Sequence, residues 1–284
     1  MNIHPQAIVS PDAKIGQGVT IGPFSIVESD VVIGDHSTLA HGVVIKSGTT
    51  LGPHNHVHEG AVLGGAPQHS RMPERLGNLV IGSHNTIREH VTIHRALHEG
   101  MSTVVGEHNL LMVGTHVAHD CHVGNQAIFA NNALLGGHVV VEDRAYVSGA
   151  VAVHQFCRIG KLAMVGGHAR VVQDVPPYVM VDGSSGYIVG LNLVGLRRNG
   201  FVAEEVAELK AAYRMIYRSG MKWSEVLSEL RSTFAEGPAS HFYTFLSQGT
   251  RGFVQERRLP PGSTLKLHRA TEEDEQPHVR RQAG

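Results

Sequence analysis

An apolar side chain returns at every sixth position through most of the sequence up to Val171. The series starts at Ile3, and its members are Ile, Val, Leu or Phe except at three positions, His69, Arg75 and Glu99. A period of six matches neither the 3.6-residue turn of an α-helix nor the plain alternation of a β-strand. It is typical of a parallel β-helix, in which three short strands make one coil. We therefore predict an all-β main domain over residues 1–180.

Small residues form a second column, four positions after each large one. They include Ala127 and Ala133, together with both cysteines of the chain, Cys121 and Cys157. One large and one small inward side chain per strand would let a narrow interior close. Because the cysteines occupy this column two coils apart, roughly 10 Å separates them, which exceeds the reach of a disulfide. We expect both to be unpaired core thiols.

Three six-residue repeats give 18 residues per coil, so residues with that spacing are predicted to lie one above another. Residues 119, 137 and 155 have this spacing. The coil would therefore bring three stretches of sequence to one place on the prism: T-H-V-A-H-D-C at 115–121, G-G-H at 136–138 and V-H-Q-F-C at 153–157.

The corners between strands carry a signature of their own, as in I-G-D-H, L-G-P-H and V-G-E-H. Glycine and short polar residues adopt the left-handed backbone that a tight corner needs. A histidine in the last position of this signature is first of all a turn residue, which applies to His36, His54, His84, His108, His138 and His168. Asp120 and His138 therefore keep a structural alternative to any chemical role. Three histidines outside this column are predicted to point outward or along an edge: His116, His119 and His154.

The repeat is interrupted at 65–79 and 95–104, which we predict to be loops projecting from the prism. After Val175 the pattern changes, and residues 181–253 are predicted to form a Gly-rich linker, at 182–200, followed by a small helical domain. The expected helices cover 204–219, 223–234 and 239–247. The remainder, 254–284, is charged, and we expect it to be disordered and without a catalytic role.

Composition argues against several classes of partner. The net charge is −1 with a pI near 7.1, and no long Lys/Arg tract stands before the tail, so neither nucleic acid nor an anionic membrane is expected to bind. Residues 1–10 lack the basic start and apolar run of a signal peptide, and no apolar stretch is long enough to span a membrane. With only 2 cysteines, we expect a cytoplasmic protein.

Several longer motifs narrow the class of β-helix. They include I-R-E-H-V-T-I-H-R at 87–95, H-V-A-H-D-C at 116–121, A-N-N-A-L-L-G-G-H at 130–138, A-V-H-Q-F-C at 152–157 and G-L-R-R at 195–198. In this order they resemble the UDP-N-acetylglucosamine O-acyltransferases that begin lipid A biosynthesis, and the resemblance covers residues 1–253. It implies a left-handed parallel β-helix that assembles as a homotrimer with sites between neighbouring prisms.

The resemblance also implies a reaction, in which a 3-hydroxyacyl group passes from acyl carrier protein to the glucosamine 3-position of UDP-N-acetylglucosamine. The phosphopantetheine arm arrives with the donor, so no bound cofactor and no metal are expected. A sugar hydroxyl is a weak nucleophile and needs a base, a role that fits His119. Asp120 would orient the imidazole, and the backbone N–H of Gly137, one coil above, would stabilise the oxyanion. Neither cysteine is placed as a nucleophile, so direct transfer is expected.

Substrate contacts are implied by the resemblance alone, and they fall on Gln68, Arg71, His94, His116, His138, His154, Gln155, Gly167, Asn192 and Arg198. Gly167 matches the position that limits acyl length, and its open space favours a longer chain than ten carbons. The sequence departs from the family pattern around the acceptor, at His69, Arg71, Ser185, Val194 and Asn199. A 3-amino sugar nucleotide or another glycolipid precursor therefore stays open as the acceptor.

Three other classes of β-helix protein are alternatives, and each predicts a different sequence feature or experimental result. A zinc enzyme of the γ-carbonic anhydrase kind needs two imidazoles five residues apart and a third about two coils earlier. The only such pair is His36 and His41, and the chain has no room upstream for the third. An acetyl-CoA-dependent acetyltransferase would accept acetyl-CoA as readily as acyl carrier protein. A non-catalytic scaffold would be indifferent to replacement of His119.

Overall fold

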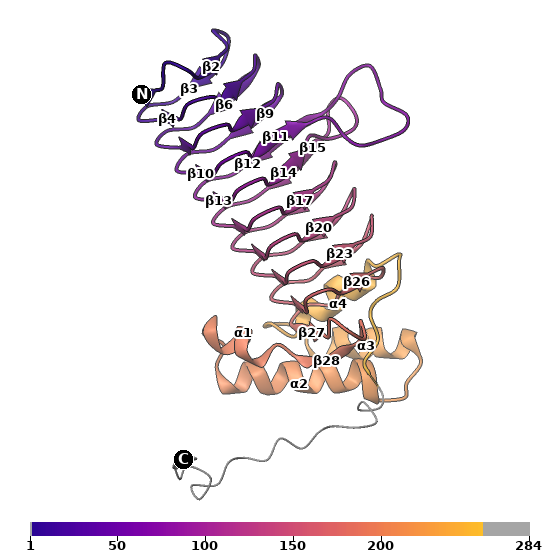
Figure 1. Cartoon of the computed structure of the whole chain (residues 1–284). Coiled ribbons are helices and arrows are strands. Elements are labelled where there is room, and N and C mark those ends of the chain that lie inside the picture. Colours follow the sequence, from indigo (N-terminus) through magenta and orange to yellow (C-terminus); the bar gives the residue numbers. More distant parts are fainter. Residues whose placement is uncertain (1, 258–284) are drawn as a thin grey trace, which may run out of the picture.

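The computed structural model describes residues 2–257, which coil into a three-sided prism followed by a group of helices (Figure 1). From β1 to β23, each strand pairs with the strand three places later in the sequence, so one coil contributes one strand to each of three sheets; at the end of the prism β25 pairs with β27. All pairs are parallel except that between β27 and β28, at the end of the prism. This is the architecture of a parallel β-helix, as the six-residue period predicts.

The three sheets are called A, B and C here in the order in which the chain enters them. Sheet A contains β1 (Asn2–Ile3), β4 (Thr20–Ile21), β7 (Thr38–Leu39), β10 (His56–Val57), β13 (Thr86–Ile87), β16 (Leu110–Leu111), β19 (Ile128–Phe129), β22 (Tyr146–Val147), β25 (Met164–Val165), β27 (Val179–Val181) and β28 (Ile188–Leu191). Sheet B contains β2 (Ile8–Val9), β5 (Ile26–Val27), β8 (Val44–Ile45), β11 (Val62–Gly65), β14 (Thr92–His94), β17 (His116–Val117), β20 (Leu134–Leu135), β23 (Ala152–Val153) and β26 (Arg170–Val171). Sheet C contains β3 (Lys14–Ile15), β6 (Val31–Ile33), β9 (Thr49–Leu51), β12 (Asn78–Ile81), β15 (Ser102–Val105), β18 (His122–Val123), β21 (Val140–Val141) and β24 (Arg158–Ile159).

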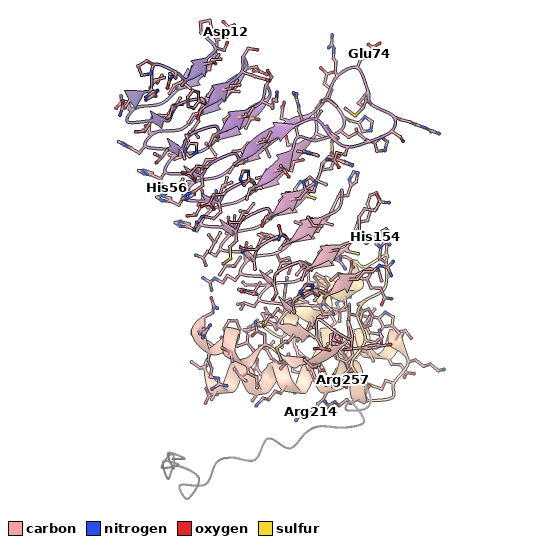
Figure 2. All side chains as sticks on the ribbon, viewed as in Figure 1. Asp12, His56, Glu74, His154, Arg214 and Arg257 are labelled. Atoms are coloured by element: carbon pink, nitrogen blue, oxygen red, sulfur yellow. The ribbon has the colours of Figure 1, made fainter. Side chains whose placement is uncertain are left out.

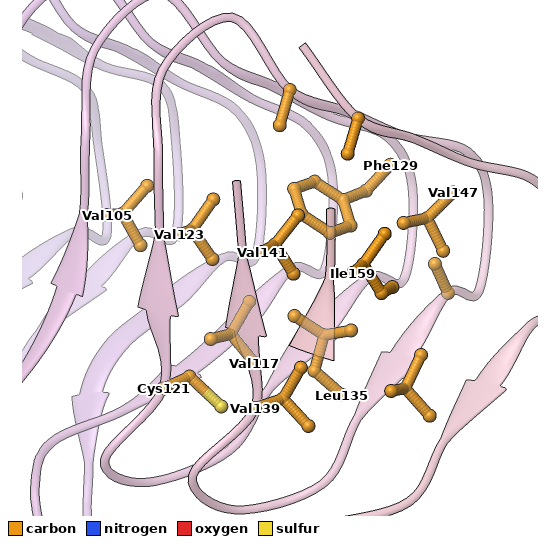
Figure 3. Close-up of a cluster of buried hydrophobic side chains, with 14 of the residues drawn as sticks. Val105, Val117, Cys121, Val123, Phe129, Leu135, Val139, Val141, Val147 and Ile159 are labelled. Atoms are coloured by element: carbon orange, nitrogen blue, oxygen red, sulfur yellow. The ribbon is translucent and has the colours of Figure 1, made fainter. Parts of the chain in front are cut away.

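The two apolar columns fill the interior of the prism, as predicted, while polar side chains such as His56 lie outside (Figure 2). Large and small residues alternate along the core, with Val117 and Leu135 beside Cys121 and Val139 (Figure 3). Both cysteines are buried and free, which confirms that they form no disulfide. Burial of this apolar surface stabilises the coil by roughly 25 cal/mol per Å².

Corner residues take the left-handed backbone that the sequence signature predicts. The φ angle is +57° at His36, +59° at His138 and +59° at Asp120. The imidazoles of one corner also stack coil on coil, with ring centroids 4.8 Å apart for His54 and His84. These histidines therefore act as structural turn residues. Asp120 has the same left-handed backbone and also occupies a corner, as the sequence predicted.

A ladder of asparagines replaces apolar residues in the small inward column of three coils. The side chain of Asn85 accepts a hydrogen bond from the N–H of Asn109 at 2.8 Å and donates one to the carbonyl of Gly106 at 2.9 Å. Asn55 in turn accepts a hydrogen bond from the N–H of Asn85 at 2.8 Å. Because Asn85 and Asn109 are buried, the ladder satisfies backbone N–H groups that water does not reach.

The two interruptions of the repeat are loops, and they are shorter than predicted. The first runs from 66 to 77, between β11 and β12, and projects from the prism (Figure 1); the second runs from 95 to 101. Strand structure resumes early because Leu79 and Thr103 are fully buried inward residues that complete the core of their coils.

The segment 182–200, predicted to be a linker, is structured. It contains β28, which pairs antiparallel with β27, and α1 (Leu193–Arg198), which Asn192 caps by accepting a hydrogen bond from the N–H of Gly195. Periodicity missed these short elements because neither is long enough to show an amphipathic pattern. The three longer helices agree with the prediction: α2 (Ala203–Arg218), α3 (Trp223–Thr233) and α4 (Ser240–Ser247).

Residues 254–257, assigned from the sequence to a disordered tail, are part of the fold. Val254 is buried, and Glu256 accepts hydrogen bonds from Tyr213 at 2.8 Å and from Arg218. The rest of the predicted tail, 258–284, lies outside the described residues. Within the described part of the chain, no helix has the length and apolar character needed to cross a membrane.

Replacing Asn85 with alanine is expected to lower the free energy of unfolding by about 2–4 kcal/mol, because it leaves the buried N–H of Asn109 and the half-buried carbonyl of Gly106 without these partners. Urea denaturation measures this as a lower midpoint. The matched control is Asn2→Ala on the exposed first strand, which should change the free energy by less than about 0.5 kcal/mol. Equal effects of the two substitutions would contradict a stabilising ladder.

Candidate active site

The corner between sheets B and C brings together the three stretches whose stacking was predicted. Leu134 pairs with His116 below it and with Ala152 above it, so the corners that follow these strands are also in register. The N–H of His138 donates to the carbonyl of His119, and the N–H of Phe156 donates to that of Gly137, each at 3.0 Å. Residues 119, 137 and 155 therefore stack as expected.

His119 and Asp120 form a hydrogen-bonded pair at this corner. The Nδ1 atom of His119 lies 2.7 Å from Oδ2 of Asp120. Asp120 is buried, and two further hydrogen bonds fix its position. Its Oδ2 accepts from the N–H of Leu97 at 3.1 Å, and its backbone N–H donates to Oγ1 of Thr103 at 2.8 Å. A carboxylate on Nδ1 selects the tautomer whose Nε2 is free to accept a proton.

Gly137 lies directly against the imidazole of His119. A Cβ atom on this glycine would stand 2.8 Å from both Cε1 and Nε2 of His119, so only glycine leaves the ring room at this point. Among residues 2–257, no acceptor takes a hydrogen bond from the N–H of Gly137. The Nε2 atom of His119 and the unused backbone donor of Gly137 thus lie side by side.

A cleft of about 610 Å³ opens over the outer face of sheet B and this corner. Its apolar floor is made by outward residues of the strands and by small corner residues. The polar groups that line it come from the prism and from the loop 66–77: Gln68, His69, His94, His116, His119 and Gln155. The cleft therefore gathers four of the ten residues that the sequence predicted to contact substrate, together with His119 and Gly137.

Two imidazoles deep in the cleft are held neutral by their surroundings. Burial lowers the pKa of His94 to about 4, and the nearby His116 and His119 act in the same direction. Burial also lowers the pKa of His116, whose Nδ1 lies 2.7 Å from Oγ1 of Thr92. The Nδ1 atom of His94 is buried and has no hydrogen-bond partner among the described residues. A buried polar atom of this kind in a cleft wall is available to a ligand.

His138 is not among the residues that line the cleft, but its ring centroid lies 5.2 Å from that of His119, and it combines a corner role with contacts to His119 and Asp120. Its ring stacks on Phe156 with centroids 4.6 Å apart, and its Nε2 is 3.8 Å from Oδ2 of Asp120. Burial lowers its pKa, which the charge of Asp120 partly opposes. At neutral pH this imidazole is therefore a neutral hydrogen-bonding group.

Several predicted contact residues lie outside the cleft of the single chain. Arg71 is exposed on the loop 66–77, where its backbone carbonyl lies 2.9 Å from Nδ1 of His69. Gly167 stands at the corner between sheets A and B. His154, one coil above Gly136 at the end of the cleft, is exposed and labelled in Figure 2.

Asn192 and Arg198 line a second cleft of about 700 Å³ on the outer face of sheet A, so one chain does not bring them to His119. Both polar atoms of the Asn192 amide are used inside the fold. The oxygen accepts from the N–H of Gly195 at 3.0 Å, and the nitrogen donates to the carbonyl of Leu162 at 2.9 Å. The structure thus gives Asn192 a helix-capping role that the sequence did not indicate.

Sequence reasoning missed three groups that shape the site. His69 was recognised only as a departure from the family pattern, yet its ring meets that of His119 edge-on at 5.9 Å. The backbone N–H of Leu97 and the hydroxyl of Thr103 fix Asp120. None of these lies at the six-residue spacing of its partner, so periodicity gave no signal for them.

Two groups of possible metal ligands occur among residues 2–257. One is the group His119, Asp120 and His138, and the other is His58, Glu59 and Glu89. In the first, Oδ2 of Asp120 already accepts two hydrogen bonds; in the second, both oxygens of Glu89 accept from Arg88 at 2.9 and 2.7 Å. Because the carboxylates are engaged, neither group resembles a prepared metal site.

Comparison with known proteins shows which family has this arrangement. A family model described as UDP N-acetylglucosamine O-acyltransferase, domain 2, matches residues 174–254, and a model of bacterial transferase hexapeptide repeats matches 12–47 and 102–137. The chain is 51% identical over 255 residues to an acyl-[acyl-carrier-protein]–UDP-N-acetylglucosamine O-acyltransferase of Alkalilimnicola ehrlichii, covering 89% of this chain and 99% of that protein. It is 46% identical over 264 residues to the protein of the same name from Verminephrobacter eiseniae, with the same shares covered.

Solved structures agree with the sequence relatives. The UDP-N-acetylglucosamine O-acyltransferase of Moraxella catarrhalis superposes with a TM-score of 0.87 at 38% identity, over 90% of this chain and 100% of that one. The enzyme of Bacteroides fragilis superposes with a TM-score of 0.85 at 36% identity, over 89% and 99% of the two chains.

Acidification is expected to destabilise the fold through His94. In the unfolded chain this imidazole takes up a proton near pH 6.5, whereas in the folded chain it does so only near pH 4. Stability is therefore lost as the pH falls from about 6.5 towards 4, by about 2 kcal/mol between pH 7 and pH 5. Urea midpoints at both pH values should show a smaller fall in His94→Gln than in the wild type. The control His122→Gln, on the outer face of sheet C, should keep the wild-type fall, and an identical fall in all three proteins would contradict the assignment.

Proposed function

Since this chain belongs to the acyl-[acyl-carrier-protein]–UDP-N-acetylglucosamine O-acyltransferases, and is therefore an acyltransferase, we propose that it moves a 3-hydroxyacyl group from acyl carrier protein to the 3-hydroxyl of UDP-N-acetylglucosamine, the first step of lipid A biosynthesis. The observation that carries the proposed chemistry is the imidazole of His119, held by Asp120 and lying against Gly137. The reaction needs a base and an oxyanion donor at one place, and this corner supplies both.

In the proposed mechanism, Nε2 of His119 takes the proton of the sugar hydroxyl as the oxygen attacks the thioester carbonyl. Asp120, 2.7 Å from Nδ1, stabilises the imidazolium that forms. The N–H of Gly137 donates to the oxyanion of the tetrahedral intermediate. Collapse of the intermediate breaks the C–S bond, and the imidazolium returns its proton to the departing phosphopantetheine thiolate.

Direct transfer is favoured because the chain offers no accessible thiol. Cys121 and Cys157 both point into the core, and burial raises their pKa values to about 12 and about 11. A buried neutral thiol is a poor nucleophile. Because the reactive thioester arrives on the carrier protein, we propose that the chain itself holds no cofactor and needs no metal.

The acceptor is proposed to lie in the cleft on sheet B, where Gln68, His94, His116 and Gln155 line the wall beside His119. The unpartnered Nδ1 of His94 supports a polar ligand at that depth. His69 stands in the same wall, where the family pattern has aspartate, and for this reason a 3-amino sugar nucleotide or a related glycolipid precursor is the alternative acceptor. The family resemblance makes Gly167 the position that limits acyl length, and we propose that the absence of a side chain there favours a longer acyl chain.

We further infer a homotrimer of left-handed coils that works in the cytoplasm. The family resemblance carries phosphate and sugar contacts onto Arg198, which lies in a different cleft from His119 in the same chain. Assembly of three chains would bring the sheet A cleft of one subunit beside the sheet B cleft of the next, which would complete the site. Two unpaired cysteines are in keeping with a reducing compartment.

The direct test is to incubate the purified protein with 3-hydroxyacyl carrier proteins of several chain lengths and either UDP-N-acetylglucosamine or its 3-amino analogue, and to identify products by mass. His119→Ala is expected to lower kcat by roughly 10²–10⁴, the usual contribution of a general base. His122→Ala, three residues away on another face, should leave the rate unchanged. Absence of product from every donor and acceptor pair would refute the proposed reaction, and equal rates with acetyl-CoA would favour an acetyltransferase.

Sharing of sites between subunits is tested by mixing inactive variants. Random trimers from equal amounts of His119→Ala and Arg198→Ala chains should recover about a quarter of the wild-type sites. A site is intact only when an Arg198→Ala chain supplies its histidine and a His119→Ala chain supplies its arginine, and each condition is met about half of the time. A mixture of His119→Ala with Asp120→Asn should recover none, since that pair belongs to one chain. Recovery in neither mixture would argue against a shared site.

A further inference from the structure

Arg251 and His154 lie side by side although 97 residues separate them in the sequence. Arg251 follows α4, and its Nη2 is 3.3 Å from Nδ1 of His154. The segment that carries it is fixed to the last coil, because the N–H of Asp174 donates to the carbonyl of Gly252 and the N–H of Val254 donates to that of Asp174. The C-terminal part of the fold therefore places the guanidinium of Arg251 at the corner between sheets B and C.

This guanidinium forms no ion pair with a carboxylate among residues 2–257. The nearby carboxylate of Asp174 is already bound by Arg158, at 2.8 Å from Nε and 2.7 Å from Nη2. The Nε atom of Arg251 is buried without a hydrogen-bond partner in the described chain. A long cationic side chain is costly to place in this way, so its contact with His154 calls for an explanation.

Two contacts of Nδ1 of His154 make opposite demands on the position of the imidazole proton. Arginine only donates hydrogen bonds, so Nδ1 must accept, and a neutral imidazole then carries its proton on Nε2. The competing partner of Nδ1 is the carbonyl of Gln155 at 3.2 Å, which would require the opposite tautomer. Without Arg251, that carbonyl would be the partner of Nδ1 in the described structure.

The position of His154 makes this choice matter for the cleft. The residues below it in the same column of the corner are Gly136 and Ala118, and both line the sheet B cleft. Their small size leaves the space under the imidazole open to a ligand. Nε2 of His154 has no protein partner among residues 2–257, so it is the nitrogen available to that ligand.

We infer that Arg251 is a positioning residue: by donating to Nδ1 it holds His154 as the Nε2–H tautomer and makes it a hydrogen-bond donor to an oxygen of the acceptor. The inference about the tautomer stands on the contacts of Arg251 alone, whereas the consequence for the acceptor rests on the proposed function. The C-terminal segment thereby takes part in the site through a side chain that does not itself touch substrate.

Nitrogen-15 spectra of the histidine side chains in the full-length protein read the tautomer directly, with His154→Gln identifying the resonances. The wild type should show a protonated Nε2 and an unprotonated Nδ1 at His154. Arg251→Met should convert it to the Nδ1–H form, and Arg251→Lys, which keeps a cationic donor, should retain the wild-type form. A Nδ1–H tautomer in the wild type, or an unchanged tautomer in Arg251→Met, would overturn the inference.

Kinetics separate this role from general stability. Arg251→Met should raise the KM for the sugar nucleotide roughly tenfold, the loss of about one hydrogen bond, and leave kcat within about twofold. Arg251→Lys should restore most of the loss, and Arg251→Met should add nothing in a His154→Gln background. The control is Arg214→Met, on the exposed face of α2, which should change neither constant. A changed tautomer with an unchanged KM would leave the inference standing and remove His154 from the acceptor contacts of the proposed function.

Discussion

Parallel pairing between successive coils is the interaction on which the rest of this structure depends. Each strand is only a few residues long, and it is held in place by hydrogen bonds to the coils above and below it. In-register pairing puts residues of neighbouring coils about 4.8 Å apart, so side chains distant in sequence become neighbours at each corner. His119 and Gly137 meet for this reason, and the candidate site follows from the same register that closes the core.

The site also depends on places where the coil is irregular. Asp120 is a corner residue with a positive φ, as His36 and His84 are, and its carboxylate could have remained a solvated turn group. It instead becomes a buried partner of His119, because the loop 95–101 supplies the N–H of Leu97 and the coil below supplies Thr103. Regular coils thus position the backbone, and the two interruptions give the corner a cleft wall and a fixed carboxylate.

The six-residue periodicity predicts the structural features that repeat from coil to coil. It gives no signal for contacts that occur only once. The inward columns, the left-handed corners, the free cysteines and the stack of residues 119, 137 and 155 were all predictable, since each follows from the six-residue spacing. The asparagine ladder, the capping role of Asn192 and the approach of Arg251 to His154 were not. These depend on individual hydrogen bonds, and the last joins segments whose relative placement no local pattern encodes.

Environment, rather than residue type, distinguishes the imidazoles that surround the cleft. Burial lowers the pKa values of His94, His116 and His138, so these rings are poor carriers of positive charge at neutral pH and are suited to neutral hydrogen bonding. His119 alone among them has a carboxylate at hydrogen-bond distance on the nitrogen remote from the cleft. A histidine base carries a positive charge between proton uptake and release. In a site from which water is largely excluded, an adjacent carboxylate is needed to stabilise that charge. The proposed assignment of the base therefore rests on Asp120 as much as on His119. The neighbouring histidines, with their lowered pKa values, are not expected to compete for the proton.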